Sequence, residues 1–298
     1  MRIIAIAALA LTLCSGQLLA AEGNLYTLQT GSGERSYKLF VPAGAPQEPL
    51  PLMIVMHGGL GNADETERTT GMNRVAQDNR FLVVYPNGTG LRLLKNRRTW
   101  NAGKCCGPAV ERQIDDVGFI RAMLDDISTH HPLDRSRIYA TGISNGAMMA
   151  YRLACELPNE IAAIVPVSGT LALNSCAGAR DIPVLHIHGG KDSNVPYNGG
   201  MGENAIAGVA HRSVPDSLRM ITSAQSCSGD ISERNLADGS RQSSWNCQGK
   251  APVQLRLIPD GEHVWPGGNS RRNDRLYGGN FSASQAAWDF VSQFRKDN

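Results

Sequence analysis

The sequence has almost no excess of charge of either sign, which excludes several kinds of partner. Over 298 residues the formal net charge is +2, and lysine and arginine form no long run. A chain that binds nucleic acid or an anionic membrane through charge would carry basic clusters. We therefore expect neither nucleic acid nor a membrane among the partners of this protein.

Internal repeats, low-complexity segments and linker-like changes of composition are also lacking. A continuous composition over this length favours one domain, which we place at residues 22–298. No CxxC pair occurs, and this argues against the common cysteine-based metal motifs. We expect no metal ion.

Long apolar runs are absent except at the N-terminus. Arg2 precedes an apolar run that ends at Leu13, and small residues follow at Ala20 and Ala21. This order is typical of a signal peptide and is too short for a membrane-spanning helix. The alternative is a buried N-terminal helix. We predict that residues 1–21 are removed and that the mature protein is secreted or periplasmic.

Six cysteines remain after that segment, an even number in a chain that we expect to be exported: Cys105, Cys106, Cys155, Cys176, Cys227 and Cys247. Such a set favours disulfide bonds. The best single pair is Cys227 with Cys247, which flank one polar loop. The sequence leaves open whether Cys105 and Cys106 pair with each other or with the remaining two.

Short apolar runs alternate with segments of helical spacing, which predicts a mostly parallel sheet with helices on both faces. The expected strands centre on residues 35–42, 52–56, 81–85, 138–141, 161–167, 182–188 and 251–258. The expected helices cover residues 65–77, 116–128, 147–157 and 284–294. Two glycine-rich stretches, the first long loop (Pro86 to Pro108) and the second long loop (Pro196 to Val214), each follow a strand. They should lie at the carboxyl edge of the sheet, where such folds bind ligands.

The motif GISNG places Ser144 between a predicted strand and a predicted helix. Glycines flank a nucleophilic serine in this way because a tight strand-to-helix turn leaves no room for β-carbons. The turn exposes the hydroxyl next to a helix N-terminus, which stabilises negative charge. The alternative is a serine that only caps the helix.

A serine hydroxyl needs a base and an orienting acid, and in this architecture they follow in the order serine, acid, histidine. Asp192 follows a strand and a Gly-Gly turn, and His263 follows the last predicted strand. We predict that these two complete a triad. An Asx turn at Asp192 and an ordinary loop histidine are the alternatives, and Asp260 and Glu262 are weaker candidates for the acid.

Ester hydrolysis also needs N–H donors for the oxyanion. We expect them from the backbone of Asn145 and of Gly59 in the motif MHGGLG, with Gly58 as the alternate. Two aromatic residues, Trp100 and Trp265, are candidates for contact with substrate or for packing under a loop.

Other polar residues have more structural interpretations. His57 should anchor its loop, and Asp115 with Asp116 should cap a helix. His186 and His188 point to one face of a strand, where packing or hydrogen bonding is favoured over metal binding.

At these residues the chain resembles a known family. The segments WNAGKCCGPAVERQIDDVGFI, GISNGAMMAYRLACELP, HGGKDSNVPYNGG and GEHVWPGG are similar to the secreted poly(3-hydroxybutyrate) depolymerase and feruloyl esterase group of α/β hydrolases. The resemblance extends from about Tyr37 to Phe294. It implies an α/β-hydrolase fold, a triad of Ser144, Asp192 and His263, and a carboxylic ester hydrolase without a cofactor. One departure is RMITSAQSC, which lacks a tryptophan expected before the cysteine.

The resemblance leaves the substrate open. Short hydroxyalkanoate oligomers and plant cell-wall feruloyl or acetyl esters, attached to polysaccharide or free, are the expected classes. The absence of extra domains in the sequence favours soluble esters over crystalline polymer. Two alternatives remain: a serine peptidase of the prolyl oligopeptidase type, and a noncatalytic binding protein on the same fold.

Overall fold

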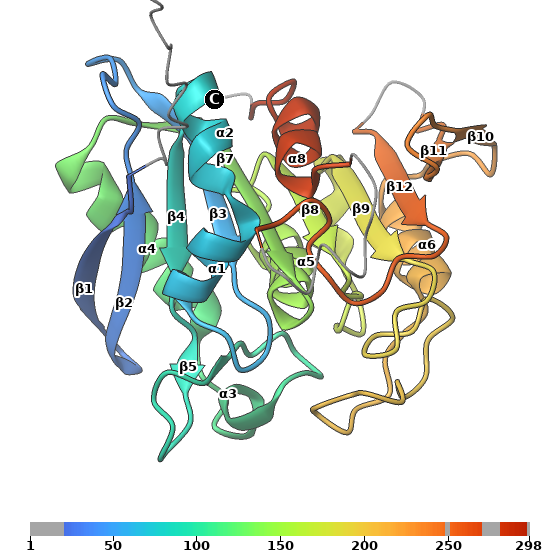
Figure 1. The fold of residues 1–298 in the computed structure, drawn as a ribbon, viewed down its shortest axis with the longest axis horizontal. Coiled ribbons are helices and arrows are strands. Elements are labelled where there is room, and N and C mark those ends of the chain that lie inside the picture. The colour runs from blue at the N-terminus through green and yellow to red at the C-terminus, as the bar shows by residue number, and fades with distance from the viewer. Residues whose placement is uncertain (1–20, 248–250, 270–280, 297–298) are drawn as a thin grey trace, which may run out of the picture.

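The computed structural model describes residues 21–247, 251–269 and 281–296. The predicted signal peptide lies outside these residues except for Ala21. Within the described part of the chain, ten strands form one twisted sheet in the order β1-β2-β4-β3-β7-β8-β9-β12-β11-β10 (Figure 1). None of the helices in the described residues is both long enough and apolar enough to cross a membrane.

Six parallel strands form the centre of the sheet: β3 (Leu50–Met56), β4 (Leu82–Pro86), β7 (Leu133–Ile143), β8 (Ala163–Val167), β9 (Val184–Gly189) and β12 (Val253–Ile258). Every residue of β3, β4, β8 and β9 is buried. Strands covered on both faces read as continuous apolar runs, which is why the sequence pattern located them correctly.

Antiparallel strands complete both edges of the sheet. They are β1 (Asn24–Thr30) and β2 (Gly33–Phe40) on one side, and β11 (Arg241–Trp245) and β10 (Ile231–Asn235) on the other. The sequence patterns predicted β2 but missed the other three. In β10 every residue is exposed, so no apolar alternation marks it as a strand.

Helices cover both faces, as the alternating pattern predicted. The helices α1 (Ala63–Thr70), α2 (Met72–Asn79) and α8 (Ala283–Val291) lie in front of the sheet in Figure 1. The helices α4 (Asp116–His130), α5 (Asn145–Glu156) and α6 (Val214–Ala224) lie behind it. Along β3, Leu52, Ile54 and Met56 pack in one core, and Met53 and Val55 pack in the other. Because successive side chains of a strand point to opposite faces, β3 contributes to the hydrophobic core on each side of the sheet.

One helical prediction needs correction, and one long helix was missed. Residues 65–77 form parts of two helices rather than one, because Gly71 takes a left-handed φ of 62° and separates α1 from α2. The helix α6 begins at the end of the second long loop and was not predicted. Short elements complete the chain: β5 (Thr89–Gly90), β6 (Arg98–Thr99), α3 (Gly107–Glu111) and the 3-10 helix η1 (Ala177–Asp181).

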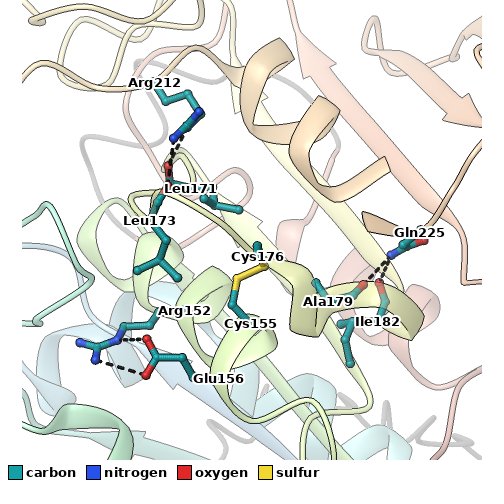
Figure 2. The surroundings of a disulfide bond; sticks show 10 residues. All are labelled: Arg152, Cys155, Glu156, Leu171, Leu173, Cys176, Ala179, Ile182, Arg212 and Gln225. Carbon is teal, nitrogen blue, oxygen red and sulfur yellow. Dashed lines mark hydrogen bonds and ion pairs between the residues drawn. A yellow bond between two sulfur atoms is a disulfide. The ribbon is translucent and has the colours of Figure 1, made fainter. Parts of the chain in front are cut away.

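All six expected cysteines form disulfides, and the structure chooses among the pairings that the sequence left open. Cys227 pairs with Cys247 as predicted, Cys105 pairs with its neighbour Cys106, and Cys155 pairs with Cys176. The last bond ties the end of α5 to the segment before η1 (Figure 2). Closing a loop of this length stabilises the fold by roughly 3 kcal/mol.

Gln225 lies in the segment RMITSAQSC, two residues before Cys227. Its side chain is fully buried, and its Nε2 donates hydrogen bonds to the carbonyls of Ala179 and Ile182 (Figure 2). These bonds join the end of α6 to η1 through polar contacts.

Candidate active site

Ser144 occupies a strained turn between β7 and α5. Its φ of 57° and ψ of −121° are sparsely populated for a residue with a side chain. A β-carbon on Gly142 would lie 2.7 Å from the Met56 carbonyl oxygen, and one on Gly146 would lie 2.4 Å from it. Both glycines are therefore required by the close approach of β3, which is the tight turn that the GISNG motif predicts.

Asp192 and His263 are brought together from the ends of two neighbouring strands, β9 and β12. His263 Nδ1 donates to Asp192 Oδ2 at 2.8 Å. The other oxygen of Asp192 accepts the backbone N–H groups of Asn194 and Val195 at 2.9 and 2.8 Å. The carboxylate thus makes the Asx-type turn and orients the imidazole at once, so the two interpretations of Asp192 are compatible.

The charge state of this pair follows from its surroundings. Burial by itself would raise the pKa of Asp192, but the hydrogen bond and charge of His263, with further help from His188, hold that pKa below its ordinary value. Asp192 is then ionised at neutral pH and accepts the Nδ1 proton. Because the Nδ1 position of His263 is taken up by this hydrogen bond, Nε2 is the nitrogen left to act toward the serine. The rival acid Asp260 is exposed and pairs with Lys191 at 2.7 Å.

A cavity of about 570 Å³ joins Ser144 and His263. Its volume is within the usual range for sites that bind small molecules. Both long loops contribute to the lining, as their place in the sequence predicted. The lining includes Gly58, Gly59, Leu91, Arg97, Cys106, Asn145, Met148, Val195, Ile206, His211 and Trp265. Motif analysis missed Val195, Ile206 and His211. Their only signal in the sequence is that Ile206 and His211 lie in the second long loop and that Val195 directly precedes it.

The two expected oxyanion donors border this cavity. Gly59 follows β3 and Asn145 opens α5, and no described residue accepts a hydrogen bond from the backbone N–H of either. A β-carbon on Gly59 would meet nothing closer than 3.9 Å, so the space beside this glycine is open. The oxyanion role of both residues stays a prediction.

Trp100 and Trp265, for which the sequence predicted the same role, have different positions relative to the cavity. Trp265 lines the cavity, and its indole N–H donates to Ser284 Oγ at 3.0 Å. Trp100 is fully buried and is not among the lining residues. The expectation that Trp100 contacts substrate is therefore wrong, because its ring packs against His57 and its N–H groups are used inside the protein.

His57 anchors the turn after β3, as expected. It is fully buried, and burial lowers its pKa to about 3, so the ring is neutral. Its Nε2 accepts the N–H of Gly88 at 2.9 Å. The proton must then lie on Nδ1, which donates to the Gly58 carbonyl at 2.7 Å.

His186 and His188 form a buried chain of hydrogen bonds along β9. The Tyr151 hydroxyl contacts His186 Nδ1 at 2.7 Å, His186 Nε2 contacts His188 Nδ1 at 3.0 Å, and His188 Nε2 contacts the Val195 carbonyl at 2.9 Å. A carbonyl only accepts, so each ring donates from Nε2 and accepts at Nδ1. Burial lowers the pKa of both histidines. The pair therefore serves packing and hydrogen bonding, the favoured interpretation.

The sequence predicted a helix-capping role for Asp115 and Asp116 together, but the two side chains make different contacts. Asp115 caps α4 by accepting the N–H of Gly118 at 2.8 Å. Asp116 is fully buried, pairs with Arg35 at 2.7 Å and accepts the N–H of Asn101 at 2.8 Å. Asp116 therefore does not cap the helix through its side chain but forms a buried ion pair and a hydrogen bond that hold the first long loop. In the described part of the chain, no cluster of histidine, cysteine and acidic side chains is arranged to hold a metal ion.

Fold and site together define the class: an α/β hydrolase, with a serine at the strand-to-helix turn and an aspartate–histidine pair at the same sheet edge. The chain belongs to the Esterase PHB depolymerase family, whose family model matches residues 35–201. The match covers just over half of the sequence and includes Ser144 and Asp192.

Individual relatives carry different substrate names. The chain is 28% identical over 251 residues to feruloyl esterase B of Piromyces equi, covering 82% of this chain and 42% of that protein. It is 29% identical over 144 residues to poly(3-hydroxyalkanoate) depolymerase C of Paucimonas lemoignei, covering 47% and 32%. The chain thus spans less than half the length of either relative.

Among solved structures, an acetyl xylan esterase from Aspergillus awamori superposes with a TM-score of 0.59 at 13% identity. The match covers 86% of this chain and 99% of that one. At this identity the likeness supports the α/β-hydrolase fold alone.

Proposed function

We propose that this protein is a serine carboxylic ester hydrolase that acts through an acyl-Ser144 intermediate. The observation that carries the proposal is the 2.8 Å hydrogen bond between Asp192 and His263, beside a cavity that both His263 and the strained Ser144 line. Family membership and esterase-named relatives add support.

The chemistry follows from the roles of the three side chains. His263 Nε2 takes the proton of the Ser144 hydroxyl as its oxygen bonds to the ester carbonyl carbon. The N–H groups of Gly59 and Asn145 bind the oxyanion of the tetrahedral intermediate. The C–O bond to the alcohol then breaks, and the alcohol leaves with the proton from His263. Water repeats the sequence, releases the acid and restores Ser144.

Asp192 supports both steps without changing its own protonation. Its carboxylate keeps the His263 proton on Nδ1, so that Nε2 faces the reaction as a base. It also stabilises the imidazolium that forms in each half of the cycle. The low pKa of Asp192 is consistent with this role.

The substrates that we propose are short hydroxyalkanoate oligomers or feruloyl and acetyl esters of plant cell walls. The cavity can hold a ligand of that size. Relatives named for each of these esters exist, so the choice among them rests on experiment. We propose one catalytic domain over residues 22–298, supported by the single ten-stranded sheet. Three disulfides support export to the periplasm or the medium.

The test begins with Ser144→Ala, compared with Ser128→Ala on the outer helix α4. We expect Ser144→Ala to lower kcat for p-nitrophenyl butyrate at least about 1000-fold, with an unchanged melting temperature. Ser128→Ala should retain full turnover. A fluorophosphonate probe should label the wild type at Ser144 and leave Ser144→Ala unlabelled. Turnover that survives in Ser144→Ala would exclude the mechanism.

A substrate panel then separates the alternatives. It comprises methyl ferulate, acetylated xylan, hydroxybutyrate oligomers and p-nitroanilide peptides. Cleavage of the anilides faster than of the esters would favour a serine peptidase. A folded wild type that neither turns over an ester nor reacts with the probe would favour a noncatalytic binding protein.

A further inference from the structure

Trp100 lies between the two segments that carry the proposed oxyanion donors. Its indole N–H donates to the His57 carbonyl at 3.0 Å, two residues before Gly59. Its backbone N–H donates to Asn145 Oδ1 at 2.7 Å, and its carbonyl accepts Asn145 Nδ2 at 3.1 Å. One buried residue of the first long loop therefore holds the end of β3 and the start of α5.

The contact with Asn145 has the geometry of a short backbone pairing. The side-chain amide offers one acceptor and one donor, and these match the N–H and carbonyl of Trp100. Asn145 is 2% exposed and Trp100 is fully buried, so water does not compete for these bonds. Hydrogen bonds in such surroundings are rigid and costly to break. The side chain of Asn145 thereby fixes the residue whose own backbone N–H borders the cavity.

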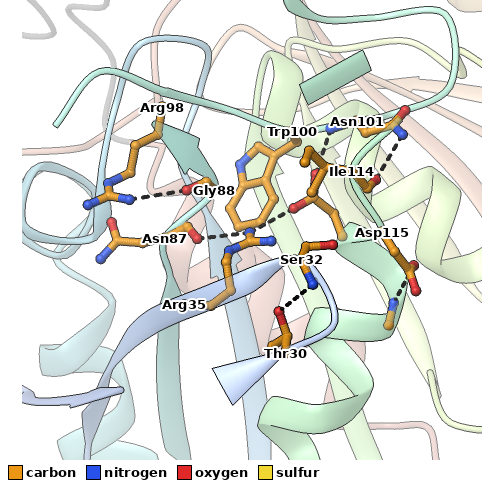
Figure 3. Close-up of polar contacts among 12 residues, drawn as sticks. Thr30, Ser32, Arg35, Asn87, Gly88, Arg98, Trp100, Asn101, Ile114 and Asp115 are labelled. Atoms are coloured by element: carbon orange, nitrogen blue, oxygen red, sulfur yellow. Dashed lines mark hydrogen bonds and ion pairs between the residues drawn. The ribbon is translucent and has the colours of Figure 1, made fainter. Parts of the chain in front are cut away.

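The contact with His57 is equally constrained. The rings of Trp100 and His57 lie 4.8 Å apart between centroids. The imidazole is fixed on both nitrogens, by the N–H of Gly88 and the carbonyl of Gly58. Figure 3 shows the indole of Trp100 with Arg98 and Gly88 on one side and Asn101 on the other. A shift of Trp100 would therefore be transmitted to the Gly58–Gly59 turn.

The sheet alone does not join the two donors. The pairing between β3 and β7 ends at Met56 with Gly142. Gly59 and Asn145 each lie three residues beyond that point. An oxyanion hole works only if both donors lie about 3 Å from the same oxygen. Past the end of the pairing, Trp100 is a direct hydrogen-bonded connection between the two segments.

We propose that Trp100 is a positioning residue of the oxyanion hole: it sets the distance between the N–H groups of Gly59 and Asn145 without touching substrate. This inference rests on the proposed esterase function. It gives Trp100 a role in kcat rather than in substrate binding, in contrast to what its sequence position indicated.

The test uses Trp100→Phe, which keeps an aromatic ring and removes the indole N–H. The control is Trp288→Phe, because Trp288 stacks on Phe81 from α8, on the opposite face of the sheet from α5. Sites are counted by fluorophosphonate labelling, so that misfolded molecules do not enter kcat. We expect kcat for p-nitrophenyl butyrate to fall about 10- to 100-fold in Trp100→Phe, less than for outright loss of a donor. KM should change by less than about twofold, and Trp288→Phe should match the wild type.

A second measurement distinguishes positioning from general damage. Butylboronic acid forms a tetrahedral adduct with an active serine and places an oxygen in the oxyanion hole, whereas butyramide binds without such an adduct. Trp100→Phe should weaken boronate binding by about the same factor as kcat and leave butyramide inhibition unchanged. A merely structural role would lower the melting temperature and the labelled fraction, with normal kcat per labelled site.

Asn145→Ala provides an independent variant if Trp100→Phe fails to fold. It keeps the backbone N–H of residue 145 and removes both bonds to Trp100, so the same pattern in kcat and boronate binding is expected. Normal kcat and boronate affinity per labelled site in the variant that folds would overturn the inference while the esterase function stands. Absence of ester turnover in the wild type would instead refute the proposed function, and the inference with it.

Discussion

The two long loops enter the same cavity but are held in very different ways. Apart from residues 92–97, which are exposed, the first long loop is tied down by the β5–β6 pairing and by buried groups, namely the bonds of Trp100 and the contact of Asn101 with Asp116. In the second long loop every residue from Glu203 to Ala210 is exposed or half-buried. Ile206 lines the cavity with 72% of its surface exposed. The first loop thus belongs to the scaffold of the proposed catalytic groups, and the second is free to vary with the substrate.

The largest effect on stability is expected where the first long loop is anchored. Arg35 and Asp116 form a buried pair, and Arg35 cannot lose its charge. Asp116→Asn leaves that charge without its counterion, so we expect a loss of about 3 kcal/mol in the free energy of unfolding. Urea titration monitored by tryptophan fluorescence measures it. Asp115→Asn is the matched control, because asparagine caps a helix as well as aspartate does.

A loss below about 1 kcal/mol in Asp116→Asn would contradict the view that this buried ion pair anchors the first long loop. It would mean that the first loop is held by its other contacts, and that the ion pair is dispensable. A similar loss in both variants would point instead to the start of α4 as the source of the instability.

Acid should weaken the anchoring of the first loop through His57. Its folded-state pKa of about 3 is far below the ordinary value of ~6.5 that the unfolded chain has. Only the unfolded state then takes up this proton between those values. The contribution is fully present above pH ~6.5 and is lost as pH falls, by up to ~1.4 kcal/mol per pH unit, or about 2 kcal/mol at pH 5.

Urea titrations of the wild type and His57→Gln between pH 8 and pH 5 test this contribution. The variant starts less stable but should lose about 2 kcal/mol less over that interval, since it lacks the titrating ring. His211→Gln in the second long loop is the comparison, because burial lowers the pKa of His211 as well but that ring is less enclosed. Equal pH dependence in the wild type and His57→Gln would show that His57 is not the acid-sensitive anchor.

The contrast between the loops also marks where sequence reasoning succeeds. The buried strands, the GISNG turn and the pairing of Asp192 with His263 follow from local patterns and chain order. The position of Trp100 does not, because its partners Asn145 and His57 are more than forty residues away and meet it only in the folded chain. The same holds for Arg35 with Asp116. Residue type alone identified an aromatic residue near the site and could not tell a buried connection from a substrate contact.

The smallest effect is expected in the second long loop, and there it should alter specificity rather than stability. Ile206→Ser removes apolar surface from the cavity wall, while the loop around it is already exposed. Butyrate has two methylenes more than acetate, and contact with each is worth up to ~0.8 kcal/mol. We therefore expect the ratio of kcat/KM for p-nitrophenyl butyrate over acetate to fall about 3- to 10-fold, with stability within about 0.5 kcal/mol of the wild type.

Leu93→Ser is the matched control for Ile206→Ser. Leu93 belongs to the first long loop, is 90% exposed and is not among the cavity-lining residues. Loss of an exposed apolar side chain is thus common to both variants, and only contact with the cavity differs. The butyrate-to-acetate ratio should stay unchanged in Leu93→Ser. If both variants shift it equally, exposed apolar surface near the mouth matters in general, and the division between a scaffold loop and a substrate loop fails.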